Sequence, residues 1–208
     1  MKLLSPFRGL RPVTERVADV IAPPYDVVNT AEARELARNK PWSFLHVSKP
    51  EIDLPEDTDP YDESVYQRGA ENFARMIDQG ILIRDQQPCF YIYELTMGEH
   101  VQTGIAAAAS IEAYDSNVIR KHEFTRPVKE DDRVRQIKAL RAQTGPVFLT
   151  YRQMNSVDGT GGNAGDDLRP IVGYRLGDVA QAAHLVGCSR AATGEQDSLI
   201  VHPSRIEH

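Results

Sequence analysis

The feature that most constrains this chain is a basic segment, residues 118–145, set in an acidic protein. The segment holds eight Lys or Arg residues against four acids, a balance of +4, whereas the 208-residue chain has a formal net charge of -6. A local reversal of sign is typical of a solvated helix laced with charge pairs. It is also typical of a site for an anionic ligand, since Arg and Lys are the residues that bind phosphate and carboxylate groups. Charge alone leaves both interpretations open.

The same segment carries the start and stop signals of one helix. Pro127 fits the first turn, where its missing N–H costs nothing, and Gly145 fits a left-handed cap after the last turn. At about 100° per residue, one apolar stripe along this helix is predicted to face the core. It consists of Val134, Ile137 and Leu140. These residues are expected to share one core with Phe148, Tyr91 and Tyr93 of the sheet.

A second, polar stripe borders the apolar one. Its members are three and four residues apart and therefore neighbours on the helix surface. They are Lys129, Asp132, Arg133 and Gln136. Side chains at the border of an apolar stripe are expected to be half buried and to face another part of the protein rather than open water.

The residues just before this helix are the candidates for proton chemistry. His122 and Glu123 lie close to the expected helix N-terminus, where free N–H groups and the helix dipole favour an anion. Histidine can donate or accept a proton near neutral pH. We therefore treat His122 and Glu123 as candidate catalytic residues.

Two proline-rich stretches near the N-terminus are expected to be extended and stiff. Arg8 and Arg11 are three apart in the first stretch and could present both guanidinium groups to one partner. Tyr25 and Asp26 follow Pro23-Pro24 in the second stretch. The alternatives are an N-terminal strap with exposed arginines and an aspartate that only organises its own turn.

These residues predict one concave site for an anion. Its candidate ligand-binding residues are Arg8, Arg11, Tyr25, Asp26, Arg126, Lys129, Asp132 and Arg133. The competing structural explanation is a closed ion-pair network in which Asp26 or Glu123 permanently fills the place of a ligand.

The remaining patterns predict an α+β fold, with a mixed or mainly antiparallel sheet covered by helices and an irregular C-terminal tail. Asn29 and Glu32 fit a capping box that opens a helix to about residue 39, and a second helix is expected from about residue 60 to 79, before Gly80. Residues 50–60, with five acids, are expected to be a solvated loop and a candidate flap. Strands are predicted at 43–47, 81–84, 89–96, 101–110 and 147–151, with a hairpin turn at 97–100.

Several function classes are not indicated by the sequence. There is no run of 18 apolar residues, so no membrane partner is expected. Two distant cysteines argue against a disulfide scaffold or a structural zinc site, so a cytoplasmic location is expected and no metal ligand is proposed. Dinucleotide-binding, P-loop, zinc-protease and nucleophile-elbow motifs are missing. The acidic net charge argues against bulk nucleic-acid binding and still allows a local contact.

Five motifs in order over residues 5–152 resemble the family numbered 1015 among the domains of unknown function. They are PFRGLRP, APPYDVV, PWSFLHVSKPEIDLP, VIRKHEFTRP-x-KEDDR and TGPVFLTY. The resemblance implies a downstream Asp-Gly-His-His-Arg motif similar to the phosphate-binding turn of ParB-like nucleotide-binding folds. It thereby implies nucleoside-phosphate or phospho-substrate handling, and it implies a histidine at the position that Gln136 occupies here.

Composition changes where these motifs stop. Residues 151–208 contain no Lys, Phe or Trp and hold eight of the fourteen glycines, and no Asp-Gly-His-His-Arg motif occurs. A segment so poor in aromatic residues is not expected to build its own core. We expect a family-like α+β domain at 1–152 and a divergent or foreign, poorly ordered tail at 153–208, as in a truncated family member. A genuine divergent tail is the alternative.

Three function hypotheses follow from these observations. The first is the handling of a phosphorylated small molecule or nucleotide through the Arg/Lys/His cluster. The second is a non-catalytic, ParB-like ligand-binding or DNA-associated regulator. The third is an inactive truncated fragment. The sequence specifies neither a cofactor nor an oligomeric state.

Overall fold

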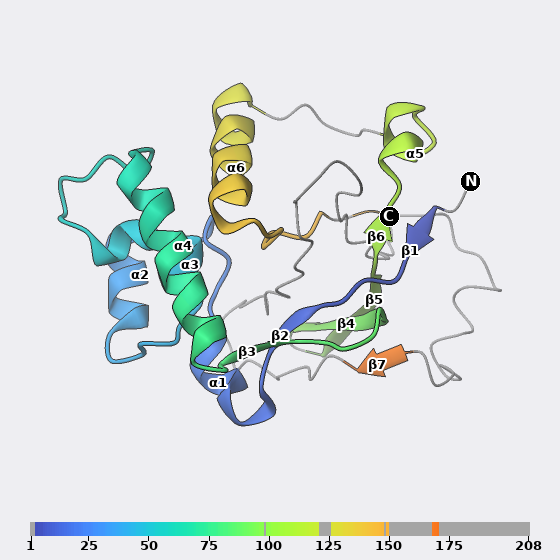
Figure 1. Ribbon diagram of the computed structural model, residues 1–208, viewed down its shortest axis with the longest axis horizontal. Helices are drawn as coiled ribbons and strands as arrows, with labels where there is room; N and C mark the ends of the chain where they lie inside the picture. Colours follow the sequence, from blue (N-terminus) through green and yellow to red (C-terminus); the bar gives the residue numbers. More distant parts are fainter. Residues whose placement is uncertain (1–2, 98, 121–125, 148, 150–167, 171–208) are drawn as a thin grey trace.

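The fold is α+β, as expected from the sequence. The computed structural model describes residues 3–97, 99–120, 126–147, 149 and 168–170. Its longer helices gather in one group, and the short strands lie beside them in another (Figure 1). Of the tail predicted at 153–208, only residues 168–170 are among those described, so its expected disorder stays a prediction.

The helical group is built around one apolar core. Its elements are α1 (Val17–Val20), α2 (Thr30–Ala37), α3 (Leu45–Ser48), α4 (Glu63–Asp78) and α6 (Pro127–Leu140), with 3-10 turns η1 (Thr14–Arg16) and η2 (Pro50–Asp53). The core holds Leu45, Val47, Phe73 and Met76, which are all almost fully buried. Burial of these side chains on α3 and α4 brings the two helices together and leaves the end of α3 against the middle of α4.

Local sequence signals explain where the first helices begin and end. The Asn29 side chain accepts a hydrogen bond from the Glu32 N–H at 2.9 Å, and the Glu32 carboxylate accepts one from the Asn29 N–H at 2.8 Å, which confirms the capping box. Helix α4 starts after Asp62, which accepts from the Ser64 N–H. It ends before Gly80, whose φ of 66° suits a residue without a side chain.

The strands form three small sheets. Strand β1 (Leu4–Ser5) pairs with β6 (Ala108–Ala109), and β2 (Leu10–Pro12) pairs with β3 (Leu82–Arg84), both antiparallel. Strand β4 (Phe90–Met97) pairs antiparallel with β5 (His100–Ala106) and parallel with β7 (Leu168–Pro170). The register pairs Met97 with His100, which confirms the predicted hairpin. Helix α5 (Ile111–Asp115) follows β6.

One predicted strand is wrong, and another lies mostly outside the described residues. Residues 43–47 lead into and form helix α3, because their apolar side chains are buried on several sides rather than on alternating faces. Val147 and Leu149 belong to no strand, and the other residues of the predicted strand 147–151 lie outside the described residues.

The core is divided, contrary to the single core expected between the long helix and the sheet. Leu140 packs in the helical core, whereas Tyr91 and Tyr93 pack in a second cluster with Phe7 and Cys89. The hairpin is thus tied to the N-terminal segment rather than to α6. Phe148, also expected in the shared core, lies outside the described residues.

Candidate functional site

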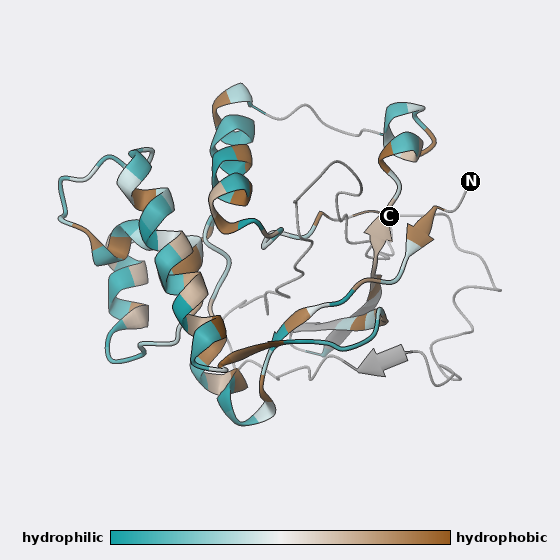
Figure 2. Cartoon of the chain, viewed as in Figure 1, coloured by the Kyte–Doolittle hydropathy of each residue, from teal (hydrophilic) through white to brown (hydrophobic). Residues whose placement is uncertain are grey.

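Helix α6 begins where the sequence predicts and ends earlier. Pro127 is its first residue, after Arg126 in extended conformation. The left-handed cap is Arg141, with a φ of 51°, and not Gly145. The helix is largely hydrophilic along its length (Figure 2).

The buried face of α6 is the polar stripe and not the apolar stripe that the periodicity predicts. Asp132 and Gln136 are 7% and 5% exposed, and Leu140 continues the same face. Val134, expected in the core, is 40% exposed, and Ile137 is half-buried. The helix is therefore turned about its axis relative to the prediction, so that its polar border faces inward against α4.

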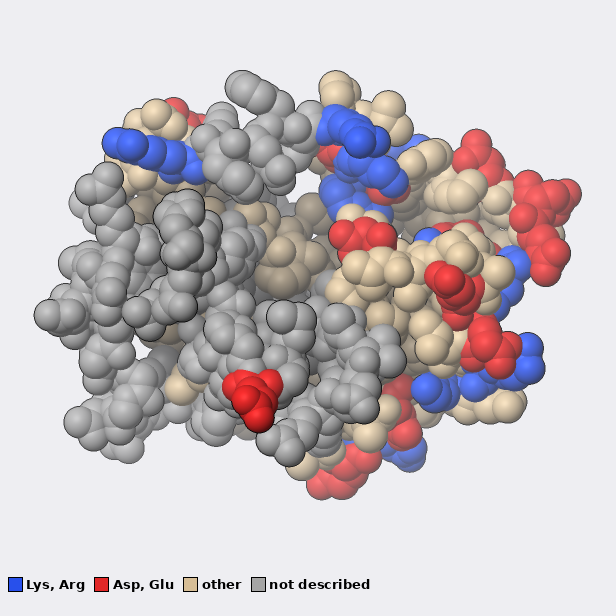
Figure 3. All heavy atoms as spheres, turned by 180° about the vertical axis from the view of Figure 1, so that it is seen from behind, with Lys and Arg blue, Asp and Glu red and all other residues tan. Residues whose placement is uncertain are grey.

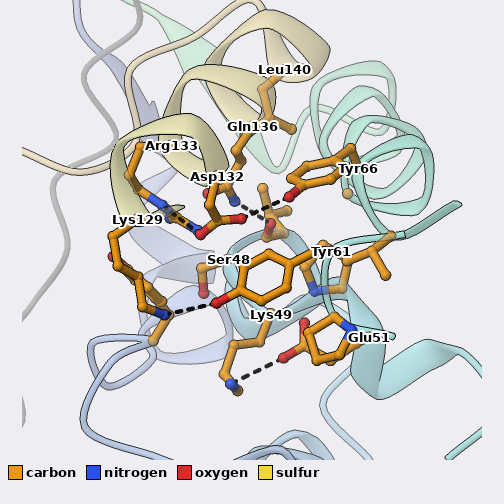
Figure 4. A pocket seen from close by; sticks show the side chains of 16 residues that line it. Ser48, Lys49, Glu51, Tyr61, Tyr66, Lys129, Asp132, Arg133, Gln136 and Leu140 are labelled. Carbon is orange, nitrogen blue, oxygen red and sulfur yellow. Dashed lines mark hydrogen bonds and ion pairs between the residues drawn. The ribbon is translucent and has the colours of Figure 1, made fainter. Parts of the chain in front are cut away.

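This inward face forms one wall of a pocket of about 90 Å³. The opposite walls come from the end of α3, from η2 and from the first turns of α4 (Figure 4). Seven polar or charged side chains from these elements and from α6 line it: Ser48, Lys49, Glu51, Lys129, Asp132, Arg133 and Gln136. Tyr25, Tyr61 and Tyr66 contribute aromatic rings to the lining.

Asp132 is the most tightly held charge in the pocket. Its Oδ1 accepts a hydrogen bond from the Tyr66 hydroxyl at 2.8 Å, and its Oδ2 accepts from Arg133 Nη2 at 2.7 Å and Nε at 3.2 Å. Burial, and then the hydrogen bond to the Asp132 carboxylate, raise the pKa of Tyr66 far above its ordinary value. The phenol is therefore a neutral donor at physiological pH, and it fixes the carboxylate in place.

The three cations of the pocket are held differently. The Arg133 guanidinium lies over the Tyr25 ring, 4.1 Å from its centroid, and Lys129 Nζ donates to the Tyr61 hydroxyl at 3.3 Å. Lys49 pairs with Glu51 at 3.0 Å. Figure 3 shows Lys and Arg side chains gathered where α6 lies. Three cations against the carboxylates of Asp132 and Glu51 leave the pocket with one net positive charge.

The end of α3 shows why polar side chains are buried here. A helix leaves its last carbonyl groups without partners inside the helix. Asn72 Nδ2 donates to the His46 carbonyl at 2.8 Å, and Gln136 Nε2 donates to the Val47 carbonyl at 3.1 Å. By contrast, the Ser48 Oγ is buried and has no hydrogen-bond partner among the described residues.

A charged network fixes η2, which carries Glu51. His46 Nδ1 lies 2.8 Å from Asp53 Oδ1, and Asn72 Nδ2 donates to Asp53 Oδ2 at 2.8 Å. Burial by itself raises the pKa of Asp53, but the hydrogen bond and charge of His46, with Asn72, outweigh it and lower that pKa. Residues 50–52 are buried, so this part of the expected solvated acidic loop is packed structure.

The structure brings together four of the predicted ligand-binding residues. Tyr25, Lys129, Asp132 and Arg133 all line the pocket. Asp26 and Arg126 are exposed and do not line it. The ligand-binding role of each stays a prediction.

Arg8 and Arg11 lie elsewhere, on and next to strand β2. Both engage Asp85: Arg8 Nε donates to its carbonyl at 2.8 Å, and Arg11 Nη2 donates to its carboxylate at 2.7 Å. The Tyr91 hydroxyl donates to the same carboxylate at 2.6 Å and accepts from the Gly9 N–H at 2.6 Å. This cluster joins β2 to the hairpin and contributes nothing to the pocket.

His122 and Glu123 lie outside the described residues, and their catalytic roles stay predictions. Sequence reasoning missed Ser48, Lys49 and Glu51, which lie in the motif PWSFLHVSKPEIDLP. The signal that could have found them is the stretch Ser48-Lys49-Pro50-Glu51, which places a hydroxyl and two charges inside a mostly apolar motif.

Within the described ranges, no group of three or more His, Cys, Asp or Glu side chains is arranged to hold a metal ion. In the same ranges, no helix has the length and apolar character needed to cross a membrane.

One family of proteins is similar to this chain over most of its length. The family model described as "Protein of unknown function (DUF1015)" matches residues 4–175. The match continues past residue 152, where the five motifs stop. No curated protein and no solved structure matches the chain.

Proposed function

Because the chain belongs to the DUF1015 family, whose function is unknown, we propose a function from the pocket itself: the binding of a small anion, such as a phosphate or carboxylate group. The group is held between α6 on one side and the α3–η2 segment on the other. It is either a free ion or the charged end of a small phosphorylated or carboxylated molecule.

The observation that carries this proposal is the hydroxyl of Ser48. A buried polar atom without a partner is costly, and native structures contain few of them. Ser48 is 9% exposed, lines the pocket, and finds no acceptor or donor among the described residues. An anion that reached this hydroxyl would supply the missing acceptor, since a hydroxyl donates readily to phosphate or carboxylate oxygens.

The cations support the same ligand class. Arg133 uses Nε and one Nη2 hydrogen for Asp132, which leaves its Nη1 group without an acceptor among the described residues. Among the described residues, Lys129 donates to the phenol oxygen of Tyr61 and has no carboxylate partner. An ammonium group and a planar guanidinium edge facing one pocket form a binding site for an oxyanion.

The size of the pocket limits the ligand. Sites for drug-sized ligands are about 300–1,000 Å³, whereas this pocket is about 90 Å³. It therefore encloses a phosphate or carboxylate group but not a whole nucleotide. If the ligand is a nucleotide, its base and sugar lie outside the pocket.

The test is the thermal stability of the full chain with and without inorganic phosphate. A ligand at ten times its Kd stabilises the folded state by about 1.4 kcal/mol, which raises the Tm of a protein of this size by about 3–6 °C. Lys129→Gln is expected to reduce the rise and Arg133→Gln to abolish it. Lys138→Gln, on the exposed side of the same helix, is the matched control and keeps the full rise.

Two results contradict the proposal. If phosphate and small carboxylates leave the wild-type Tm unchanged, the pocket is a closed structural network. In that case Arg133→Gln lowers stability equally with and without anion, because it leaves Asp132 short of its partner. Retention on DNA that falls with salt, without a phosphate effect, would favour the DNA-associated alternative.

A further inference from the structure

Two carboxylates line a pocket that we propose for an anion, and this combination restricts the ligand. The side chains of Asp132 and Glu51 are 9% and 10% exposed, so neither can turn into solvent when an anion enters. Asp132 is held by Tyr66 and Arg133, and Glu51 is held by Lys49. Any ligand in the pocket therefore lies near fixed negative charge as well as near the cations (Figure 4).

Both carboxylates keep free acceptor capacity. Each carboxylate oxygen can accept about two hydrogen bonds. Oδ1 of Asp132 accepts one, from Tyr66. Glu51 Oε1 accepts from Lys49 and, at 3.4 Å, from Thr30 Oγ1, while its Oε2 accepts none from the described residues. The pocket thus offers donors from Arg133, Lys129 and Ser48 beside acceptors from Asp132 and Glu51.

An anion that has only acceptor oxygens fits this pattern poorly. Its lone pairs would meet those of the carboxylates, and like charges at short range in a buried site repel. An anion with its own O–H or N–H group instead donates to a carboxylate while its charged oxygens accept from the cations. Hydrogen bonds to charged partners are among the stronger ones in proteins.

We infer that the pocket selects small anions that carry their own hydrogen-bond donor and rejects anions of the same shape that carry none. The inference rests on the proposed function, since it specifies the ligand of the same pocket. Hydrogen phosphate and hydroxy-carboxylates belong to the selected class. Sulfate and simple carboxylates belong to the rejected class.

The test compares matched anions by calorimetric titration of the full wild-type chain at constant ionic strength. At about pH 8, hydrogen phosphate and sulfate have nearly equal charge and similar shape, and only phosphate has an O–H group. We expect phosphate to bind at least about tenfold more tightly than sulfate. Glycolate against acetate repeats the comparison for carboxylates and is expected to show the same order.

Asp132→Asn tests whether Asp132 causes the preference for phosphate over sulfate. The amide supplies a donor in place of an acceptor, so sulfate binding is expected to strengthen and the ratio to fall toward one. Glu51→Gln tests the second carboxylate in the same way. If Asp132→Asn does not fold, the affinity ratios of phosphate to sulfate and of glycolate to acetate in the wild type still test the selectivity, because they require no variant.

The outcomes separate the two proposals. Equal, measurable binding of phosphate and sulfate overturns the selectivity and leaves the anion pocket standing. No binding of any of the four anions overturns the anion pocket and the selectivity with it. A phosphate preference that persists undiminished in both carboxylate variants also overturns the inference, because the discrimination would then arise from other groups.

Discussion

Gln136 offers the sharpest test of how α6 is placed. Its side chain is 5% exposed, and its Nε2 donates to the Val47 carbonyl at 3.1 Å, at the end of α3. That carbonyl is one of those that a helix end leaves without an internal partner. Gln136→Leu removes the donor with little change in volume and leaves a buried carbonyl oxygen unpaired.

The size of the effect follows from that geometry. A buried polar group left without its partner costs about 1–3 kcal/mol, and we expect about 2 kcal/mol here because the substituted leucine side chain would regain some apolar contact with the core. For a chain of this length, 1 kcal/mol shifts the Tm by about 2–4 °C. Gln136→Leu should therefore lower the Tm by about 4–8 °C.

The measurement is equilibrium unfolding in urea, followed by circular dichroism, together with the Tm. Gln136→His is the first control: the family resemblance implies a histidine at this position, and an imidazole N–H can replace the amide donor, so the loss should be under about 1 kcal/mol. Gln143→Leu is the second: Gln143 donates to the Gly145 carbonyl at the surface, and its loss should stay within about 0.5 kcal/mol. If Gln136→Leu is as stable as the wild type, the inward orientation of the polar stripe is wrong.

Three further predictions test the same placement and its surroundings. Val134→Asp should change the Tm little, whereas Leu140→Asp should prevent soluble folding, because only the second carboxylate would be buried; equal tolerance of both would contradict the orientation of α6. Gly69→Ala should lower the Tm, although alanine favours a helix, because its Cβ would lie 2.8 Å from Pro50 Cγ. An unchanged or raised Tm would show that Pro50 moves away to admit the added methyl group. The pKa of Asp53 is lower in the folded state than its ordinary value of 3.8, so its contribution is present above that pH and is lost as the pH falls through the lowered value. Acid titration should therefore destabilise the wild type more steeply than Asp53→Asn, and equal slopes below about pH 4 would refute this role.

Local signals predicted the elements whose ends depend on neighbouring residues in the sequence. The capping box at Asn29, the helix start at Pro127 and the hairpin between β4 and β5 need no knowledge of the rest of the chain. Residues 43–47 show the limit of such signals. A short apolar run is compatible with a buried strand and with a buried helix. In this protein the run forms a helix that packs against α4.

The candidate site was predictable in part for the same reason. The spacing of Lys129, Asp132 and Arg133 makes them neighbours on one helix face, and that relation holds once the helix forms. The residues that meet them from α3 and η2 depend on tertiary packing, which spacing along the chain does not contain. The two N-terminal arginines illustrate this point: Arg8 and Arg11 do share one partner, as their spacing allowed, but that partner is Asp85 of the protein itself.

The predicted orientation of α6 failed, and that failure points most directly to function. Hydrophobic periodicity placed Val134 inside, and a helix that served stability alone would bury it. The chain instead exposes Val134 and buries Asp132 and Gln136, which must then be provided with hydrogen-bond partners. Natural sequences depart from local patterns mainly where a site requires it. Here the departure turns Lys129, Asp132 and Arg133 toward Ser48 and Glu51 and places Gln136 against the end of α3, so the orientation of α6 agrees with the anion pocket that we propose.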